Sequence, residues 1–393
     1  MKLAARTGLI EPFYVMEWAK AAAELARSPA CDPAQGGRPM IYLNIGEPDF
    51  TAPPLVQEAA ERCIRDGRTQ YTPALGLEAL RERISAWYAQ RFGIDVPARR
   101  IVLTAGASGA LQLACLALVD VGDEVLMPDP SYPCNRHFVH AAQGKAVMIP
   151  STAATRFQLT ADQVEAHWGE RTRGVLLASP SNPTGTSLHP QEMRRIVEAV
   201  RARGGVTLVD EIYLGQSFDA TFGHSALEHG DDVVTINSFS KYFCMTGWRL
   251  GWLVVPDALV PAIEKLAQNL YICPSTVSQH AALACFEPDS LAEYERRRDE
   301  FKARRDFLVP ALNRLGLTVP VEPDGAFYAW ADCSKHHASS WDFAFEVMQR
   351  AQLAITPGRD FGHADTQRYI RLSYASRRDL LEEAVHRLQQ LLG

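Results

Sequence analysis

Several side chains that can handle protons stand directly after short apolar runs of this sequence. Asp210 and Tyr213 follow the run Val206–Val209, and Lys241 follows the run Val233–Ile236 by five residues. A carboxylate can hold a proton or a cation, a phenol can donate a hydrogen bond, and a deprotonated lysine amine is both nucleophile and base. Taken singly, Asp210 could cap a helix and Lys241 could be a surface lysine, but together these residues are hard to explain as scaffold.

Groups that suit an anion follow other apolar runs. The segment Gly106-Ala107-Ser108-Gly109 comes after Ile101–Thr104 and opens a helical pattern. Small residues at a helix start leave backbone N–H groups free, and the helix dipole favours negative charge there. Asn182 lies in a polar loop after Gly174–Ala178, and Arg249 precedes a further apolar run. Phosphate or carboxylate binding is therefore expected.

The elements that must position these residues follow a strand–helix rhythm. Their apolar runs lack in/out alternation, as expected for strands buried on both faces. Helical patterns such as Pro190–Arg203 separate them, which predicts an α/β domain with a mostly parallel, seven-stranded sheet flanked by helices. In such sheets ligands bind beyond the carboxyl ends of the strands, where all the residues above would meet. The expected strands are Ile101–Thr104, Glu124–Met127, Ala146–Ile149, Gly174–Ala178, Val206–Val209, Val233–Ile236 and Leu250–Val255.

Both chain ends have a different pattern and predict a smaller α+β domain built from the two together. Helices are expected over Pro12–Ala26, Leu291–Leu315 and Arg378–Leu392. The charge run within Leu291–Leu315 is interpreted as a solvated helix face; its arginines are Arg296, Arg297, Arg298, Arg304 and Arg305. The predicted division is residues 1–45 for the N-terminal segment of the small domain, 46–290 for the large ligand-binding domain and 291–393 for the rest of the small domain.

Composition excludes several classes of protein. The 393 residues carry a net charge of −6, which argues against a nucleic-acid partner. Eight cysteines without a C-x-x-C motif indicate buried thiols in a reducing compartment, so a cytoplasmic location is expected. Met1–Phe13 lacks the apolar core of a secretory signal. The uncharged stretch Ile101–Val119 is split by turn residues, which favours a strand, turn and helix over a membrane span.

Four motifs together resemble a known family. They are Asn182-Pro183-Thr184-Gly185, Asp210-x-x-Tyr213, Ser238-x-Ser240-Lys241 and Gly247-x-Arg249-x-Gly251. This spacing resembles the pyridoxal-phosphate enzymes of fold type I, and more narrowly the class I/II aminotransferases, of which aspartate aminotransferase is the best-known member. The resemblance runs from Ile45 to Ala375, nearly the whole chain.

The resemblance implies roles at the cofactor ring. Lys241 would form the aldimine with the pyridoxal phosphate aldehyde and then move the proton at the substrate α-carbon. Asp210 would keep the pyridine nitrogen protonated, so that the ring accepts electrons. Asn182 and Tyr213 would donate to the phenolic oxygen, and Tyr132 would stack on the ring.

It also implies two anion sites. The cofactor phosphate would be held by backbone, hydroxyl and guanidinium donors, which are Ala107, Ser108, Ser238, Ser240 and Arg249. The resemblance adds Tyr71, donated by the neighbouring subunit. A homodimer with shared active sites is therefore expected. The substrate α-carboxylate would bind Arg371, assisted by Asn182 and the backbone of Gly46. No metal, nucleic acid or membrane is expected to take part.

The predicted function is amino-group transfer between an L-amino acid and a 2-oxo acid by a ping-pong mechanism. The same motifs also fit other fold type I enzymes, such as a C–S lyase or a ring-forming synthase, because the cofactor carries the chemistry. A regulator with an added DNA-binding domain is disfavoured, since only about 40 residues precede Gly46. Gly106-x-Ser108 lacks the final glycine of a hydrolase elbow, and His137 and His140 lack a third metal ligand.

The substrate side chain is the least constrained part of the prediction. The N-terminal segment Phe13–Met16 is apolar and without positive charge. If it lines the site, an apolar or aromatic side chain is favoured, with 2-oxoglutarate or pyruvate as acceptor. Ordinary packing of the first helix explains the same residues equally well. Arg136, four residues after Tyr132, could instead turn inward and bind a second carboxylate.

Overall fold

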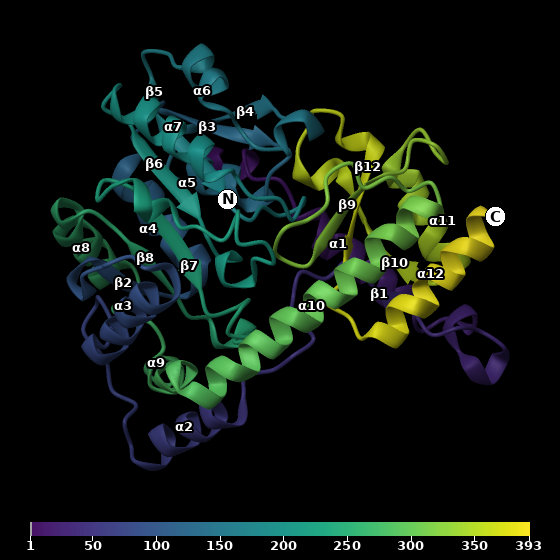
Figure 1. Ribbon diagram of the computed structural model, residues 1–393, viewed down its shortest axis with the longest axis horizontal. Coiled ribbons are helices and arrows are strands. Elements are labelled where there is room, and N and C mark those ends of the chain that lie inside the picture. The colour runs from purple at the N-terminus through teal and green to yellow at the C-terminus, as the bar shows by residue number, and fades with distance from the viewer. Residues whose placement is uncertain (1) are drawn as a thin grey trace.

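A seven-stranded sheet forms the centre of the protein, whose computed structural model describes residues 2–393 (Figure 1). The strand order is β2-β8-β7-β6-β5-β3-β4, and only β8 runs antiparallel to its neighbours. The predicted α/β fold with a mostly parallel sheet is confirmed. The strands are β2 Ile101–Thr104, β3 Glu124–Asp129, β4 Lys145–Pro150, β5 Thr172–Ala178, β6 Val206–Asp210, β7 Val234–Ser238 and β8 Gly251–Val254.

Both faces of the sheet are covered, which explains the continuous apolar runs. Along β5, Val175 and Leu177 belong to one core cluster, while Leu176 between them belongs to the cluster on the opposite face. Each strand residue in the middle of the sheet therefore buries its side chain. The helices of this region are α2 Pro54–Arg65, α3 Glu78–Phe92, α4 Gly106–Leu118, α5 Pro133–Ala141, α6 Ala161–His167, α7 Pro190–Arg201, α8 Val260–Leu270 and α9 Thr276–Ala282.

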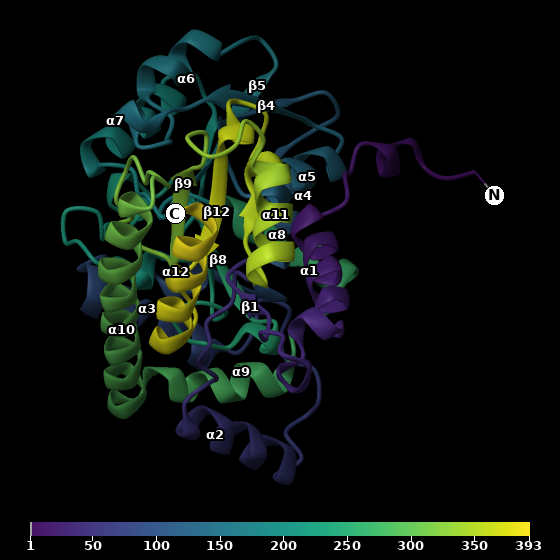
Figure 2. The same ribbon diagram turned by 90° about the vertical axis from the view of Figure 1, so that its right-hand side faces the viewer.

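Helices near the two chain ends pack together beside the sheet (Figure 2). Trp18 and Leu43 share one core cluster with Leu308 and Leu388. Trp18 also contacts Trp341 with ring centroids 5.0 Å apart. The boundaries of the predicted domains stay a prediction. The elements of this part are α1 Tyr14–Leu25, β1 Ile41–Tyr42, α10 Pro288–Arg314, β9 Tyr328–Asp332, α11 Ser340–Ala351, β10 Leu353–Ala354, β11 Thr356–Pro357, β12 Tyr369–Ser373 and α12 Arg378–Leu392.

The long helix α10 differs from its predicted role as a solvated face. It runs from the neighbourhood of α9 to the small sheet (Figure 1), so neighbouring segments cover part of its surface. Arg297, Arg304 and Arg305 are buried. Arg304 donates to Asp49 at 2.8 Å, and Arg305 donates to the Pro323 carbonyl at 2.7 Å. For these three arginines the prediction was wrong, because each one joins the helix to another segment.

Other predictions concern buried thiols and membrane spans. All eight cysteines are free, and six of them are buried. Ile101–Val119 folds as strand β2 and helix α4, as predicted. Across residues 2–393, no helix combines the length and apolar character needed to cross a membrane.

Candidate active site

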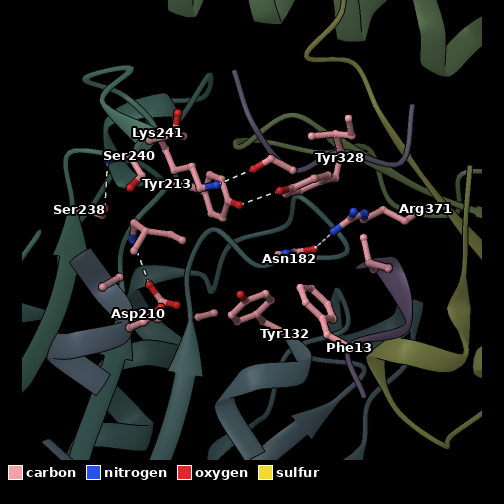
Figure 3. A pocket seen from close by; sticks show the side chains of 18 of the residues that line it. Phe13, Tyr132, Asn182, Asp210, Tyr213, Ser238, Ser240, Lys241, Tyr328 and Arg371 are labelled. Carbon is pink, nitrogen blue, oxygen red and sulfur yellow. Dashed lines mark hydrogen bonds between the residues drawn. The ribbon is translucent and has the colours of Figure 1, made fainter. Parts of the chain in front are cut away.

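A cavity of about 270 Å³ lies where the carboxyl ends of the parallel strands meet α1 and β12 (Figure 3). Twelve of the thirteen predicted site residues line it. They are Gly46, Ala107, Ser108, Tyr132, Asn182, Asp210, Tyr213, Ser238, Ser240, Lys241, Arg249 and Arg371. Ten of them lie at the ends of strands of the large sheet, as expected for this edge. Gly46 and Arg371, 325 positions apart in the sequence, come from the segments beside the large sheet.

Lys241 comes from the loop after β7 and reaches into the cavity. Its Nζ donates to the Gly46 carbonyl at 2.5 Å and lies 5.7 Å from the centre of the Tyr213 ring. Burial lowers the pKa of Lys241 to about 8, because a charged ammonium is poorly solvated there. The amine is therefore much easier to deprotonate near neutral pH than an exposed lysine.

Asp210, the last residue of β6, lies at the floor of the cavity and is 4% exposed. One of its oxygens accepts from the Ile212 backbone N–H at 3.2 Å. Burial raises the pKa of Asp210 to about 7, and no ion pair to it forms among residues 2–393. A cation placed against this carboxyl would relieve its desolvation, which fits the protonated nitrogen of a pyridine ring.

The start of α4 and the Arg249 guanidinium form an anion cradle. No side chain caps the helix at Ala105, so its first N–H groups stay free. Gly106 has φ +73°, and a Cβ on it would lie 2.4 Å from Arg249 Nη2. A Cβ on Gly251 would lie 2.8 Å from the Ala107 nitrogen. The missing side chains thus leave room for the guanidinium beside the helix end, and the donor set fits a phosphate.

Arg371, on β12, is a second anion site and is 2% exposed. It donates to Asn182 Oδ1 at 2.8 Å and to the Asn44 carbonyl at 2.7 Å, while its buried Nε has no partner in the described chain. The guanidinium lies 4.5 Å from the centre of the Tyr328 ring. A positioned, buried guanidinium without a carboxylate partner suits a ligand carboxylate.

Comparison with known proteins identifies the family. The sequence model described as "Aminotransferase class I and II" matches residues 38–388. The chain belongs to the class I and II aminotransferases. A "Valine--pyruvate aminotransferase" from Mycobacterium tuberculosis is 38% identical over 98% of this chain and 97% of its own length. A "(5-formylfuran-3-yl)methyl phosphate transaminase" from Methanocaldococcus jannaschii is 32% identical over 91% and 92%.

Solved structures agree with this assignment. The crystal structure of an aminotransferase from Mycobacterium tuberculosis superimposes with a TM-score of 0.94 at 37% identity, covering 100% of this chain and 99% of the other. The protein is thus a transferase of nitrogenous groups with the fold type I architecture. The two named relatives differ in their substrates, so family membership leaves the substrate of this aminotransferase open.

Tyr328 and Asn44 also line the cavity of this aminotransferase, and the sequence did not point to either. The Tyr328 hydroxyl lies 2.8 Å from that of Tyr213 (Figure 3). Tyr328 sits on β9, which pairs with the strand that carries Arg371. A predicted β9–β12 pairing would have been the signal, since it places Tyr328 and Arg371 on one face.

Three other predicted groups lie outside this cavity. Tyr71 is 78% exposed and does not line it. Arg136 donates to the Asp360 carbonyl and to Glu11, at 3.2 to 3.3 Å, so it does not turn into the pocket. The rings of His137 and His140 lie 6.0 Å apart, and residues 2–393 contain no group of three side chains suited to a metal ion.

Proposed function

We propose that this aminotransferase uses pyridoxal 5'-phosphate to move an amino group between an apolar L-amino acid and a 2-oxo acid, with pyruvate as acceptor. One observation carries the substrate class. Three cations line the cavity, Lys241, Arg249 and Arg371, while the wall formed by α1 is apolar. Each cation has a role in holding the cofactor or the α-carboxylate. Among residues 2–393 of this chain, no further cation lines the cavity for a second carboxylate on the substrate.

The residues present fit the cofactor. Its phosphate would be held at the start of α4 by Ala107 and Ser108, and by Ser238, Ser240 and Arg249. Tyr132 would cover the ring, and Asn182 and Tyr213 would donate to its phenolic oxygen. When bound, pyridoxal phosphate supplies an electron sink for the pair left on an α-carbon that loses its proton.

Lys241 and Asp210 divide the proton handling in this proposal. The Lys241 amine, with its lowered pKa, takes the proton from the substrate α-carbon and returns one during the other half of the reaction. The Gly46 carbonyl orients the amine through the 2.5 Å hydrogen bond. Asp210 would accept the hydrogen bond of the protonated ring nitrogen and so keep positive charge where electrons accumulate.

Arg371 and Asn182 orient the substrate. The guanidinium would bind the α-carboxylate in a bidentate manner, which leaves the substrate side chain facing Phe13, Val15 and Met16. An apolar side chain loses water on entering this wall, whereas aspartate would bury a charge without a partner. The similarity to a valine–pyruvate aminotransferase supports the same substrate class.

A homodimer in the cytoplasm completes the proposal. Tyr71 exposes 78% of its surface and lies outside the cavity of its own subunit, as suits a residue that reaches the phosphate of a partner subunit. Eight free cysteines suit a reducing compartment.

The experiment is a half-reaction screen with the cofactor-loaded protein. Alanine, valine, methionine, phenylalanine and aspartate are mixed in turn with the enzyme in the absence of acceptor, and the released 2-oxo acid is quantified. We expect one equivalent per site from the apolar donors, as a ping-pong mechanism requires. The time course of release gives the second-order rate constant of each half-reaction. An aspartate rate constant tenfold or more above the others, equivalent to about 1.4 kcal/mol, would refute the apolar substrate class.

A further inference from the structure

The apolar wall of the cavity belongs to a helix whose N-terminus has no cap of its own. Phe13 precedes α1, and it lines the cavity together with Val15, Met16 and Ala19. The N-cap position, Phe13, provides no side-chain hydrogen bond. Free N–H groups at a helix start need an acceptor, and they favour negative charge.

Asp360 supplies that acceptor from the other end of the chain. Its Oδ1 accepts from the Tyr14 N–H at 3.2 Å, and its Oδ2 accepts from the Val15 N–H at 2.7 Å. Asp360 is 2% exposed. Both carboxylate oxygens are thus committed to the first two residues of α1.

The segment that carries Asp360 is fixed to the sheet. Arg136 donates to the Asp360 carbonyl, and Ser131 donates to the Phe361 carbonyl at 2.8 Å. The Asp129 carboxylate accepts from the His363 N–H at 3.0 Å. A Cβ on Gly362 would lie 1.7 Å from Asp129 Oδ1, so only glycine allows this approach.

The same segment leads into β12. The Phe361 ring lies 4.9 Å from the Arg371 guanidinium, while Asp360 holds α1 on the other side. One short stretch of chain therefore sets both the group proposed to bind the α-carboxylate and the wall proposed to contact the side chain.

We propose that Asp360 is a positioning residue for substrate specificity, which holds the start of α1 so that Phe13, Val15 and Met16 form the side-chain pocket. The inference rests on the proposed function, because it assumes that the substrate side chain faces this wall. It also gives Arg136 a role, since that arginine fixes the Asp360 backbone.

The first experiment measures the helix directly and needs no activity. Hydrogen exchange of the peptide containing Tyr14 and Val15 is compared between wild type and Asp360→Ala, each loaded with cofactor. We expect exchange at these two amides to rise at least ~10-fold, because their acceptors are gone. Unchanged exchange would overturn the proposal, whatever the enzyme's activity.

The second experiment separates side-chain contacts from general damage. In Asp360→Ala, KM for valine and phenylalanine should rise about tenfold, while kcat stays within about twofold of the wild-type value. The reason is that the displaced wall contacts the side chain equally in the bound substrate and in the transition state. KM for alanine, whose methyl group reaches less of the wall, should change less than about twofold. Equal losses for all three donors would overturn the specificity role.

A matched control and two further variants complete the design. Glu192 also accepts from the first N–H of a helix, that of Ala161 in α6 at 2.7 Å, although Thr160 caps α6 as well, and Glu192 lies outside the cavity. Glu192→Ala should leave the ratio of KM for valine to KM for alanine unchanged. Phe13→Ala should raise KM for valine and phenylalanine more than KM for alanine, as Asp360→Ala does. In the double variant, Asp360→Ala should then raise these KM values little further. If Asp360→Ala does not fold, Asp360→Asn replaces it, because the asparagine keeps one acceptor oxygen. The same KM ratio is then measured for Asp360→Asn, and an unchanged ratio overturns the specificity role.

The activity of the wild-type protein distinguishes failure of this inference from failure of the proposed function. A wild-type protein that releases no 2-oxo acid from any amino acid contradicts the proposed function, and the exchange experiment still tests the cap. A second outcome is an active wild type together with an Asp360→Ala variant whose exchange rises but whose ratio of KM for valine to KM for alanine is unchanged. This outcome leaves the proposed function intact and overturns the specificity role.

Discussion

Replacement of Arg371 by alanine tests how the site distinguishes an amino acid from a simple amine. The guanidinium is buried and already oriented by Asn182 and Asn44, and its Nε has no partner in the described chain. Two charge-assisted hydrogen bonds to a carboxylate contribute about 1.5–3 kcal/mol each. A net loss of about 3–4 kcal/mol corresponds to a fall of ~10²–10³-fold in kcat/KM.

The assay compares valine with 2-methylpropylamine, which is valine without its carboxylate. Arg371→Ala should slow the half-reaction of valine by ~10²–10³-fold and that of 2-methylpropylamine by no more than about threefold. Arg368→Ala is the matched control, because Arg368 lies just before β12 but pairs with Asp332 at 2.6 Å on the surface. Equal losses for both amines in Arg371→Ala would refute the carboxylate role.

Other predictions concern the floor of the cavity, its phenols and the subunit interface. Burial raises the pKa of Asp210 to about 7, so its contribution to the stability of the cofactor-free protein should fall by up to about 4 kcal/mol as pH rises from about 4 to 7. Urea unfolding of Asp210→Asn should show a slope smaller by this amount, with the slope from buried Glu211, whose pKa is raised to about 8, remaining; an equal slope in both proteins would contradict the prediction. Tyr328→Phe removes the hydroxyl contact to Tyr213 and should cost about 0.5–1.5 kcal/mol of unfolding free energy by the same method; a variant as stable as wild type would argue against that bond. Mixing Tyr71→Ala with Lys241→Ala subunits should restore activity that neither variant has alone, and no recovery after subunit exchange would speak against a shared site.

The large sheet could be predicted because its strands leave a strong signal. A strand buried on both faces is a short apolar run, and all seven such runs form strands within a few residues of the predicted bounds. The parallel direction then sends Asp210, Ser238 and the loop of Lys241 to one edge, without any knowledge of side-chain contacts. Ten predicted residues meet in one cavity for this reason, whereas Gly46 and Arg371 lie outside the large sheet and were predicted from the family resemblance alone.

The contribution of the small sheet could not be predicted in the same way. Tyr328 reaches the site only because β9 pairs with β12 in a register that sets Tyr328 opposite Ser373. A shift by one residue would turn the phenol to the other face. A short strand near the C-terminus carries too little pattern to fix that register, and the run around Tyr328 therefore had no functional signal.

The arginines show most clearly where sequence patterns stop being informative. Arg136 and Arg304 both belong to helices, and a helical arginine is usually exposed. Each is buried here because a distant segment supplies acceptors: the Asp360 carbonyl for Arg136, and Asp49 for Arg304. Those partners lie more than 200 residues away in the chain. The contact to Asp360 keeps Arg136 out of the pocket, and in our proposal it fixes the residue that positions the apolar wall. A guanidinium turned into the pocket would instead favour a substrate with a second carboxylate. The proposed specificity of this aminotransferase thus rests on which acceptor the Arg136 guanidinium contacts, and only the folded chain determines that contact.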